Sequence, residues 1–454
     1  MKKTILLLAA MMSLSVSAQQ NATPHSDQRS EKWTLEDCIR YAIENNITLK
    51  KSQLSKQTAT ETLKQSKAAL FPSLTAQTNQ TLGYRPWTDE ASITVTDGQV
   101  DTKTEKTYYN GSYGVNAQWT VWNGNQNYNQ VKLNRVSEEK AALAVEETAN
   151  TIQESIAKLY VQILYQTEAI EVNRQSLETS KKNEERGQAM MEVGKMSKAD
   201  VAQLTAQRAT DEYNLVNAES QLANFKMQLK QQLELTTEDF DVAVPATSDE
   251  QALQAIPSLV SVYEAALLQR PEIKNAELSK RSGDLQLKIA KAGWLPTLSL
   301  TAGVSTSTTS LNDTKWGDQM RNKFAASGGL GLSIPIFDQR KARTAVNKAK
   351  IQQLTADLDL LDKQKALWKS IEGFWLDAQT NQQKFRSALV SVESEQTSYD
   401  LLSEQFQLGL KNIVELMTGK DKLLKAQQNK LQSKYTTILN QQLLKFYQGE
   451  MMKI

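Results

Sequence analysis

The chain has 454 residues, and its 53 lysines and arginines against 51 acidic residues give a formal net charge of +2. Because the positive and negative charges are nearly equal in number, the chain has no global basic field that would attract nucleic acid. No nucleic-acid partner is expected. The single cysteine excludes an intrachain disulfide and a thiolate-rich zinc site, and the single histidine nearly excludes His-centred catalysis and multi-His metal sites. We therefore predict a protein that is not an enzyme and that needs no metal or cofactor.

Residues 1–18 have the pattern of a secretory signal peptide. A basic Met-Lys-Lys start is followed by an apolar run and by a small-residue cleavage site that ends at Ala18. The apolar run is too short for a membrane-spanning helix. Residues 19–32 are polar and predict a flexible leader. The mature protein is therefore expected to be exported.

A helix is predicted from Thr34 to about Ala69. Asp37 lies three residues after Thr34, the spacing that a capping box requires, and Pro72 ends the helix. Cys38 falls within this helix and is expected to be a small, buried apolar residue.

Four segments alternate between apolar and polar residues, as the strands of a membrane barrel do. From Tyr109 to Val121 the odd positions are mostly apolar or aromatic and the even positions small or polar. Lengths near ten residues fit a tilted strand that spans a bilayer, although a soluble half-buried sheet would show the same period. The expected strands are residues 73–84, 108–122, 297–305 and 324–336, with bounds that are approximate.

Two very long helices are predicted after the strand pairs. The region 126–190 alone would form a helix of roughly 100 Å, far longer than a globular core requires. Apolar residues repeat along it in steps of four and three, so it is expected to pack lengthwise on neighbours. This seam comprises Val145, Ala149, Ile152, Ile156, Leu159, Ile163, Ile170 and Leu177. The later copy comprises Ile351, Leu354, Leu358, Leu361, Trp368 and Trp375.

The chain repeats itself. One constant offset matches Pro72 with Pro296, and a second, shorter offset matches Gly194 with Gly409. A single deletion between the two later strands explains the change from the first offset to the second. The predicted division is a first repeat at 33–234, a linker at 235–258, a second repeat at 259–446 and a C-terminal tail at 447–454.

The number of strands constrains the assembly. Four strands leave two open edges, and each unpaired backbone group in lipid costs several kcal/mol. Closure requires at least about eight strands, so several chains must build one barrel. Three chains that give twelve strands would close it, and two that give eight would also do so.

The order of these features resembles that of the TolC-like outer-membrane efflux proteins. The resemblance rests on the signal peptide, the duplicated pattern of strand pair and long helix, the glycine turns, and Ala-x-x-x-Pro-x-Leu before each first strand. It implies a mainly α fold with a transmembrane β-barrel. Three copies would form a twelve-stranded barrel that continues into a periplasmic α-helical tube, thickened at its middle by the linker and the C-terminal segment.

The same resemblance implies a function and a location. The protein would be a passive exit duct in the cell outer membrane, with a large periplasmic portion, in a tripartite efflux or type I secretion system. It would carry small molecules or polypeptides. Its expected partners are two further copies of itself, a periplasmic adaptor (membrane fusion) protein, an inner-membrane transporter and outer-membrane lipid.

By resemblance, the functional residues lie at the two glycine turns. Each glycine allows the left-handed conformation that ends a helix. The expected adaptor-docking residues are Val193, Gly194, Lys195, Leu408, Gly409 and Leu410, and the expected pore-gate residues are Asp200, Phe406, Lys411 and Glu415. Three copies of Glu415 would form an acidic ring that favours cations, although Thr418 replaces the family's second pore acid. Asp200 and Glu415 also fit capping boxes with Ser197 and Asn412.

Two alternatives belong to other classes. A wholly periplasmic coiled-coil adaptor would share the long helices, but it would be expected to have one helical hairpin flanked by compact β-domains. A periplasmic hydrolase is disfavoured by the histidine content and by the lack of a nucleophile motif.

Overall fold

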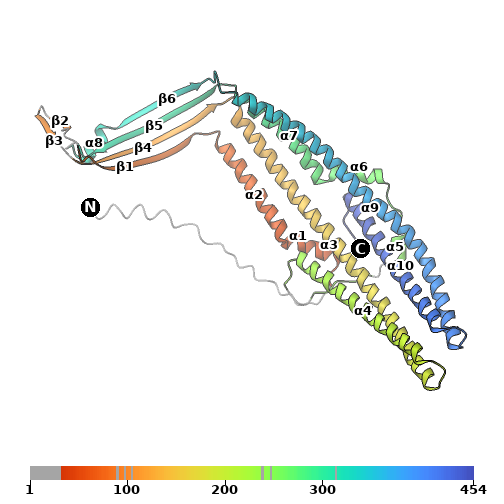
Figure 1. Cartoon of the computed structure of the whole chain (residues 1–454). Helices are drawn as coiled ribbons and strands as arrows, with labels where there is room; N and C mark the ends of the chain where they lie inside the picture. The colour runs from red at the N-terminus through yellow and green to blue at the C-terminus, as the bar shows by residue number, and fades with distance from the viewer. Residues whose placement is uncertain are drawn as a thin grey trace.

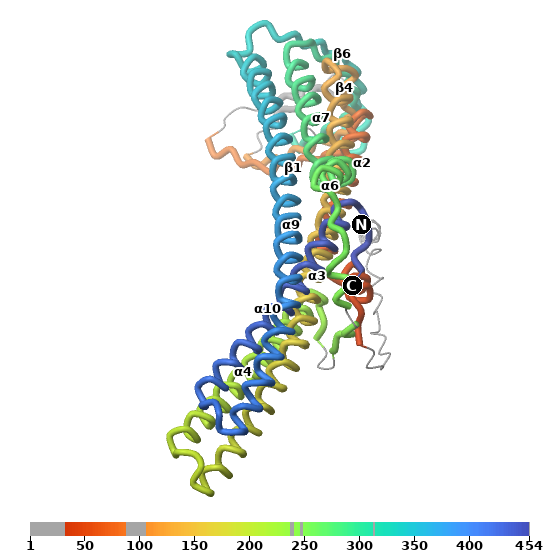
Figure 2. The backbone as a smooth tube through the Cα atoms, turned by 90° about the vertical axis from the view of Figure 1, so that its right-hand side faces the viewer, coloured from red at the N-terminus to blue at the C-terminus, as the bar shows by residue number. Residues whose placement is uncertain are grey.

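The computed structural model describes residues 32–87, 92–96, 99–103, 106–236, 240–245, 248–311 and 314–453. The predicted signal peptide and all of the predicted leader except Lys32 lie outside the described residues. The molecule is elongated, with a sheet at one end and two long helical hairpins that end at the other (Figure 1). A view from the side shows α9 running along most of this length (Figure 2).

One antiparallel sheet contains the four long strands. Its order is β1-β4-β5-β6, so β1 and β6 form its two edges. Its strands are β1 (Ser73–Tyr84), β4 (Thr107–Trp122), β5 (Thr297–Thr309) and β6 (Ala325–Ser333), and a short hairpin of β2 (Ser92–Thr96) and β3 (Gln99–Lys103) lies between β1 and β4 in the chain. The four alternating segments are thus strands, but the last one is shorter than predicted. It stops before Pro335, which has no amide hydrogen for a ladder.

The helices occupy the rest of the described chain. α3 and α9 have 67 residues each, which makes each roughly 100 Å long. Among the residues that the structure describes, no helix is both long and apolar enough to cross a membrane. The helices are α1 (Leu35–Asn45), α2 (Ile47–Ala68), α3 (Gln126–Glu192), α4 (Lys198–Gln232), α5 (Asp249–Ala252), α6 (Leu259–Gln269), α7 (Pro271–Ala292), α8 (Trp316–Asn322), α9 (Lys341–Gln407) and α10 (Ile413–Tyr447).

The prediction of one uninterrupted helix from Thr34 to about Ala69 is wrong. The helix breaks at Asn46, whose side-chain oxygen accepts hydrogen bonds from the amides of Thr48 at 2.9 Å and Leu49 at 3.2 Å. Asn46 therefore caps a new helix, α2, instead of continuing α1. The second repeat has the same break before Pro271, which stands at the first position of α7.

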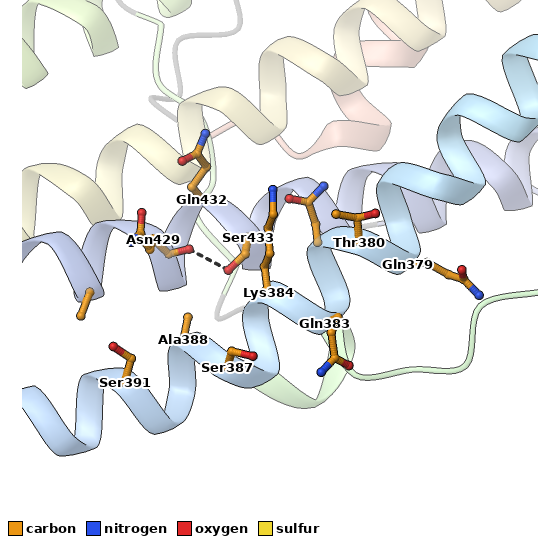
Figure 3. Close-up of a pocket in the computed structure, with 12 residues that line it drawn as sticks. Gln379, Thr380, Gln383, Lys384, Ser387, Ala388, Ser391, Asn429, Gln432 and Ser433 are labelled. Atoms are coloured by element: carbon orange, nitrogen blue, oxygen red, sulfur yellow. Dashed lines mark hydrogen bonds between the residues drawn. The ribbon is translucent and has the colours of Figure 1, made fainter.

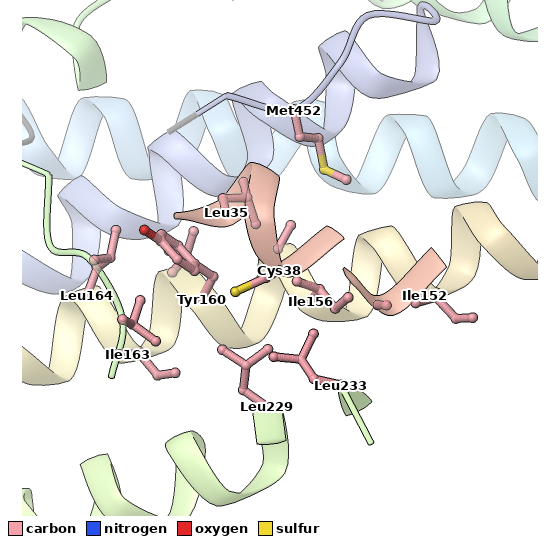
Figure 4. Packing of buried hydrophobic residues seen from close by; sticks show 14 of the residues in the cluster. Leu35, Cys38, Ile152, Ile156, Tyr160, Ile163, Leu164, Leu229, Leu233 and Met452 are labelled. Carbon is pink, nitrogen blue, oxygen red and sulfur yellow. The ribbon is translucent and has the colours of Figure 1, made fainter. Parts of the chain in front are cut away.

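The main apolar core lies midway along the molecule, where α1, α3 and α4 meet (Figure 4). Cys38 is fully buried there, as predicted, and burial raises the pKa of its thiol to about 12. The Tyr160 hydroxyl donates to the carbonyl of Ala243 at 2.7 Å, and Met452 packs into the same cluster. The linker and the C-terminal segment are thereby attached to the middle of the helices.

The two predicted helical seams differ in what covers them. Along α3, five seam residues are buried within the chain: Ile152, Ile156, Ile163, Ile170 and Leu177. Along the half of α9 nearer the sheet, Ile351, Leu354, Leu358 and Leu361 are all exposed. The α3 stripe is therefore largely covered within the chain, whereas the half of the α9 stripe nearer the sheet is open to a partner.

Candidate functional site: the helix tips

Two tight turns close the helical hairpins at the end farthest from the sheet (Figure 1). We call them the helix tips, residues 193–195 between α3 and α4 and residues 408–411 between α9 and α10. Gly194 has a φ of 71° and Gly409 a φ of 74°, the left-handed conformation that the sequence predicts. The next amides, of Lys195 and Leu410, donate to carbonyls five residues back at 2.8 and 2.9 Å. A side chain would be strained at either glycine.

The returning helix of each hairpin begins with a capping box, as predicted. The Asp200 amide donates to Ser197 Oγ at 3.1 Å, and the Ser197 amide donates back to the Asp200 carboxylate at 3.4 Å. Glu415 and Asn412 repeat this arrangement at 2.9 and 3.2 Å. Each cap contributes about 0.5–2 kcal/mol, so both tips have sharply defined helix starts.

Two of the predicted gate residues form an ion pair. Lys411 Nζ lies 2.6 Å from Glu415 Oε1. The hydrogen bond from Lys411, together with the one from the Asn412 amide, lowers the pKa of the Glu415 carboxyl below its ordinary value. Glu415 is therefore charged at neutral pH, but a lysine of the same chain already neutralises it.

Phe406 lies in an apolar cluster that joins the two hairpins. The cluster includes Leu204 from α4 and Leu416 from α10, and all three side chains are buried. Of the four predicted gate residues, the single chain thus pairs Lys411 with Glu415, buries Phe406 and engages Asp200 in its cap.

Several predicted docking residues present apolar surface to solvent. Val193 is 69% exposed, Leu408 74% and Leu410 71%. Large aliphatic side chains at the extreme end of a hairpin bury little surface within their own chain. Exposed aliphatic side chains that gather at both tips are a feature of surfaces that another protein covers.

A buried ion pair also connects the two hairpins, in addition to the apolar cluster around Phe406. The Lys420 ammonium, on α10, donates to the carboxylate of Asp211 on α4 and to Ser180 Oγ on α3 at 2.5 Å. Lys420 is only 5% exposed and Asp211 only 2%. Burial lowers the pKa of Lys420, and the hydrogen bond from its ammonium to Asp211 opposes this shift. The two charges thus depend on each other across the boundary between the hairpins.

The sequence prediction missed this pair, although a signal for it is present. Leu416, Lys420 and Leu423 follow the four-and-three spacing of a buried seam, and Asp211 lies one heptad after the buried Leu204. A charge at a seam position must be paired if it is buried. Only the fold, however, identifies a partner 209 residues away.

A separate groove lies between α9 and α10 (Figure 3). This groove of about 840 Å³ is lined mostly by amide, hydroxyl and small side chains, with Lys384 as its one ionisable residue. Its short lining side chains include Ser387 and Ala388 of α9 and Ser433 of α10 (Figure 3). Within the described ranges, no group of three or more His, Cys, Asp or Glu side chains is placed to hold a metal ion.

Comparison with known proteins identifies the family to which these hairpins and this sheet belong. The family model described as "Outer membrane efflux protein" matches residues 38–233 and 262–450. The chain belongs to this family. The match includes all four long strands and both tips of this outer membrane efflux protein.

Individual relatives agree with this assignment. The chain is 22% identical over 408 residues to the outer membrane efflux protein BepC of Brucella suis biovar 1 (strain 1330), which covers 89% of this chain and 83% of BepC. It is 24% identical over 363 residues to the outer membrane protein TolC of Escherichia coli (strain K12), with 72% of each chain covered. A crystal structure of CusC has the same fold, with a TM-score of 0.79 and 16% identity over 96% of this chain and 99% of that chain.

Membership of this family identifies the general function of the chain. This outer membrane efflux protein is an exit duct for efflux, located in the outer membrane with a large periplasmic helical part. Its family is one of channel proteins and not a family of enzymes.

Proposed function

We propose that three copies of the chain form one passive duct that runs from the outer membrane through the periplasm. An inner-membrane transporter supplies the energy, and a periplasmic adaptor couples the transporter to the helix tips. The duct itself performs no chemistry. Its cargo, small molecules or polypeptides, is selected by the transporter that loads it.

The observation that carries this proposal is the four-stranded sheet with β1 and β6 at its edges. A sheet that ends in two unpaired edges cannot reside in lipid, because every exposed backbone group there costs several kcal/mol. Twelve strands from three chains remove all such edges. The matched family, whose members lie in the outer membrane, supports this environment for the sheet.

The exposed stripe on α9 supports the same assembly. Ile351, Leu354, Leu358 and Leu361 lie on consecutive turns, and each is more than half exposed in the single chain. Burying such a stripe against a second copy would gain about 25 cal/mol for each Å² of apolar surface removed from water. The helices below the sheet would then form a closed wall instead of an open trough.

The mass of the detergent-solubilised mature protein tests the assembly. Light scattering, with the detergent contribution subtracted, should give the mass of three chains, and the trimer should conduct ions across a planar lipid bilayer. A stable monomer or dimer would refute the proposed duct.

The docking role of the tips has its own test. A photo-cross-linking residue at Leu410 should capture, in intact cells, a periplasmic protein that contains a helical hairpin, and Leu408→Asp should abolish this capture without changing the trimer mass. The matched control carries the cross-linker at Leu268, which is similarly exposed but lies on α6. Equal capture from both positions would remove the tips from the proposal.

A further inference from the structure

The two edges of the sheet differ in where they lie along the strand direction, and this difference determines how two copies fit together. On the basis of the proposed trimer, we infer that β6 of one protomer pairs antiparallel with β1 of its neighbour, with Gly329 opposite the neighbour's Asn79. In this register Gly331 lies opposite Gln77, and Ala325 lies opposite Gly83.

The stagger of the strands is the first argument. Ser73 pairs with Gln118, Gln118 with Thr301, and Thr301 with Gly329, so the first residue of β1 is level with the middle of β6. All of β1 therefore lies to the outer side of that level, whereas β6 extends equally to both sides. For the two edges to pair over their full length, the neighbour's β1 must shift until its middle, at Thr78 and Asn79, meets Gly329.

Only one of these two central residues lies on the same face of the sheet as Gly329. Gln77 pairs with Gly114, Gly114 with Ser305, and Ser305 with Ala325, so odd-numbered residues of β1 and β6 share the small and polar face. A pair across the seam must join residues of one face, because a slip of one residue would turn every side chain of the strand over. Gly329 therefore meets Asn79 and not Thr78.

The short helix α8 fixes the end of the seam. It lies beyond the outer end of β6, against the part of β5 that β6 does not cover. Gln319, only 4% exposed, accepts from the Thr309 amide at 2.7 Å and donates to the Thr309 carbonyl at 2.9 Å, so its side chain takes the place of a strand partner. The Thr306 hydroxyl adds a bond to the Met320 carbonyl at 2.8 Å.

The width of α8 excludes a register in which the neighbour's β1 is shifted two residues further outward. A helix is about 10 Å across, about twice the spacing of neighbouring strands, so a strand beside β6 cannot continue past α8. With Gly329 opposite Asn79, β6 begins at Ala325 beside Gly83, and the neighbour's β1 ends one residue later at Tyr84. With Gly329 opposite Gln77, the last three residues of β1 would run into the helix.

The inferred register also gives a reasonable barrel. Within one chain Gly329 is level with Ser73, whereas at the junction with the neighbour it is level with Asn79. Each β6–β1 junction therefore offsets the strand register by six residues, and the three junctions together offset it by about 18 around the twelve strands. At about 3.4 Å per residue and 4.8 Å between strands, the strands tilt by about 45°. This is the ordinary tilt of bilayer-spanning strands.

Disulfide mapping tests the register. In a Cys38→Ala background, Asn79→Cys combined with Gly329→Cys should give a covalent trimer on a non-reducing gel after oxidation, and reductant should return it to monomer. The pair Thr78→Cys and Leu330→Cys should do the same from the other face of the sheet. A link within one chain is impossible, because β4 and β5 separate the two edges by about 14 Å and a disulfide needs Cα atoms within about 7 Å.

The matched controls combine Asn79→Cys with Ser327→Cys or with Gly331→Cys, each two residues out of register. Both should give at least tenfold less covalent trimer. A stronger product from either control would overturn the register while leaving the trimer intact. Failure of every pair in a protein of trimeric mass would show that β6 and β1 do not meet. A mass other than that of a trimer would refute the proposed assembly and the register with it.

Discussion

Replacing Lys420 by methionine should loosen the attachment of the α9–α10 hairpin to the α3–α4 hairpin. The substitution keeps the length and apolar stem of the side chain but removes the ammonium that contacts Asp211 and Ser180. Asp211, which is only 2% exposed, then keeps only hydroxyl donors. Breaking one side of a buried ion pair costs about 3–5 kcal/mol, because a charge is left without its partner.

Hydrogen exchange measures this cost where it arises. A local loss of 3–5 kcal/mol corresponds to roughly 10²–10⁴-fold faster exchange of protected amides in the first turns of α10. The double variant Lys420→Met with Asp211→Leu should recover most of the protection, because it leaves no buried charge. Met in place of the exposed Lys422 serves as the surface control. Wild-type protection in the single variant, or equal loss in the single and double variants, would refute the role assigned to the pair.

Three further outcomes are expected. Gly409→Pro should leave the trimer yield intact but abolish export, because proline cannot adopt a φ of 74° or donate the turn hydrogen bond to the carbonyl of Phe406; an export assay beside the detergent mass checks both parts. Leu358→Asp should yield monomer by light scattering, because it places a charge in the open stripe of α9. The pKa of the Glu415 carboxyl is lowered in the folded state, so the charged carboxylate stabilises its tip. This stability should be complete above about pH 4.5, the ordinary pKa, and should decline as the pH falls through the lowered folded-state pKa. Hydrogen exchange of the tip amides, measured against pH with Glu415→Gln as the unresponsive control, tests this direction.

Local patterns in the sequence predicted the elements whose formation depends on near neighbours. Alternation over about ten residues identified the strands, and single residues identified the glycine turns and the capping boxes. The break at Asn46 was missed because asparagine is tolerated within a helix, and only its bonded amides show it to be a cap. The offset that matches Pro72 with Pro296 also matches Asn46 with Arg270, just before Pro271, and this match was the available hint.

Long-range chemistry could not be predicted in the same way. α8 has seven residues, too few for any periodicity, and what holds it is the contact of Gln319 with a strand edge. Lys420 and Asp211 belong to different repeats, and their spacing along the chain contains no information about their meeting. The predicted gate residues came from the family resemblance, and their roles in a trimer remain predictions.

The two repeats carry different insertions at the same place. Between the strands of the first pair the chain forms the β2–β3 hairpin, and between those of the second pair it forms α8 (Figure 1). A trimer of such chains has a nearly sixfold wall but only threefold symmetry on the surface that faces the cell's surroundings. A phage fibre or an antibody that recognises one insertion would find three sites per duct and not six. Escape from either agent would require changes in that insertion alone, and the strands that close the wall would stay as they are.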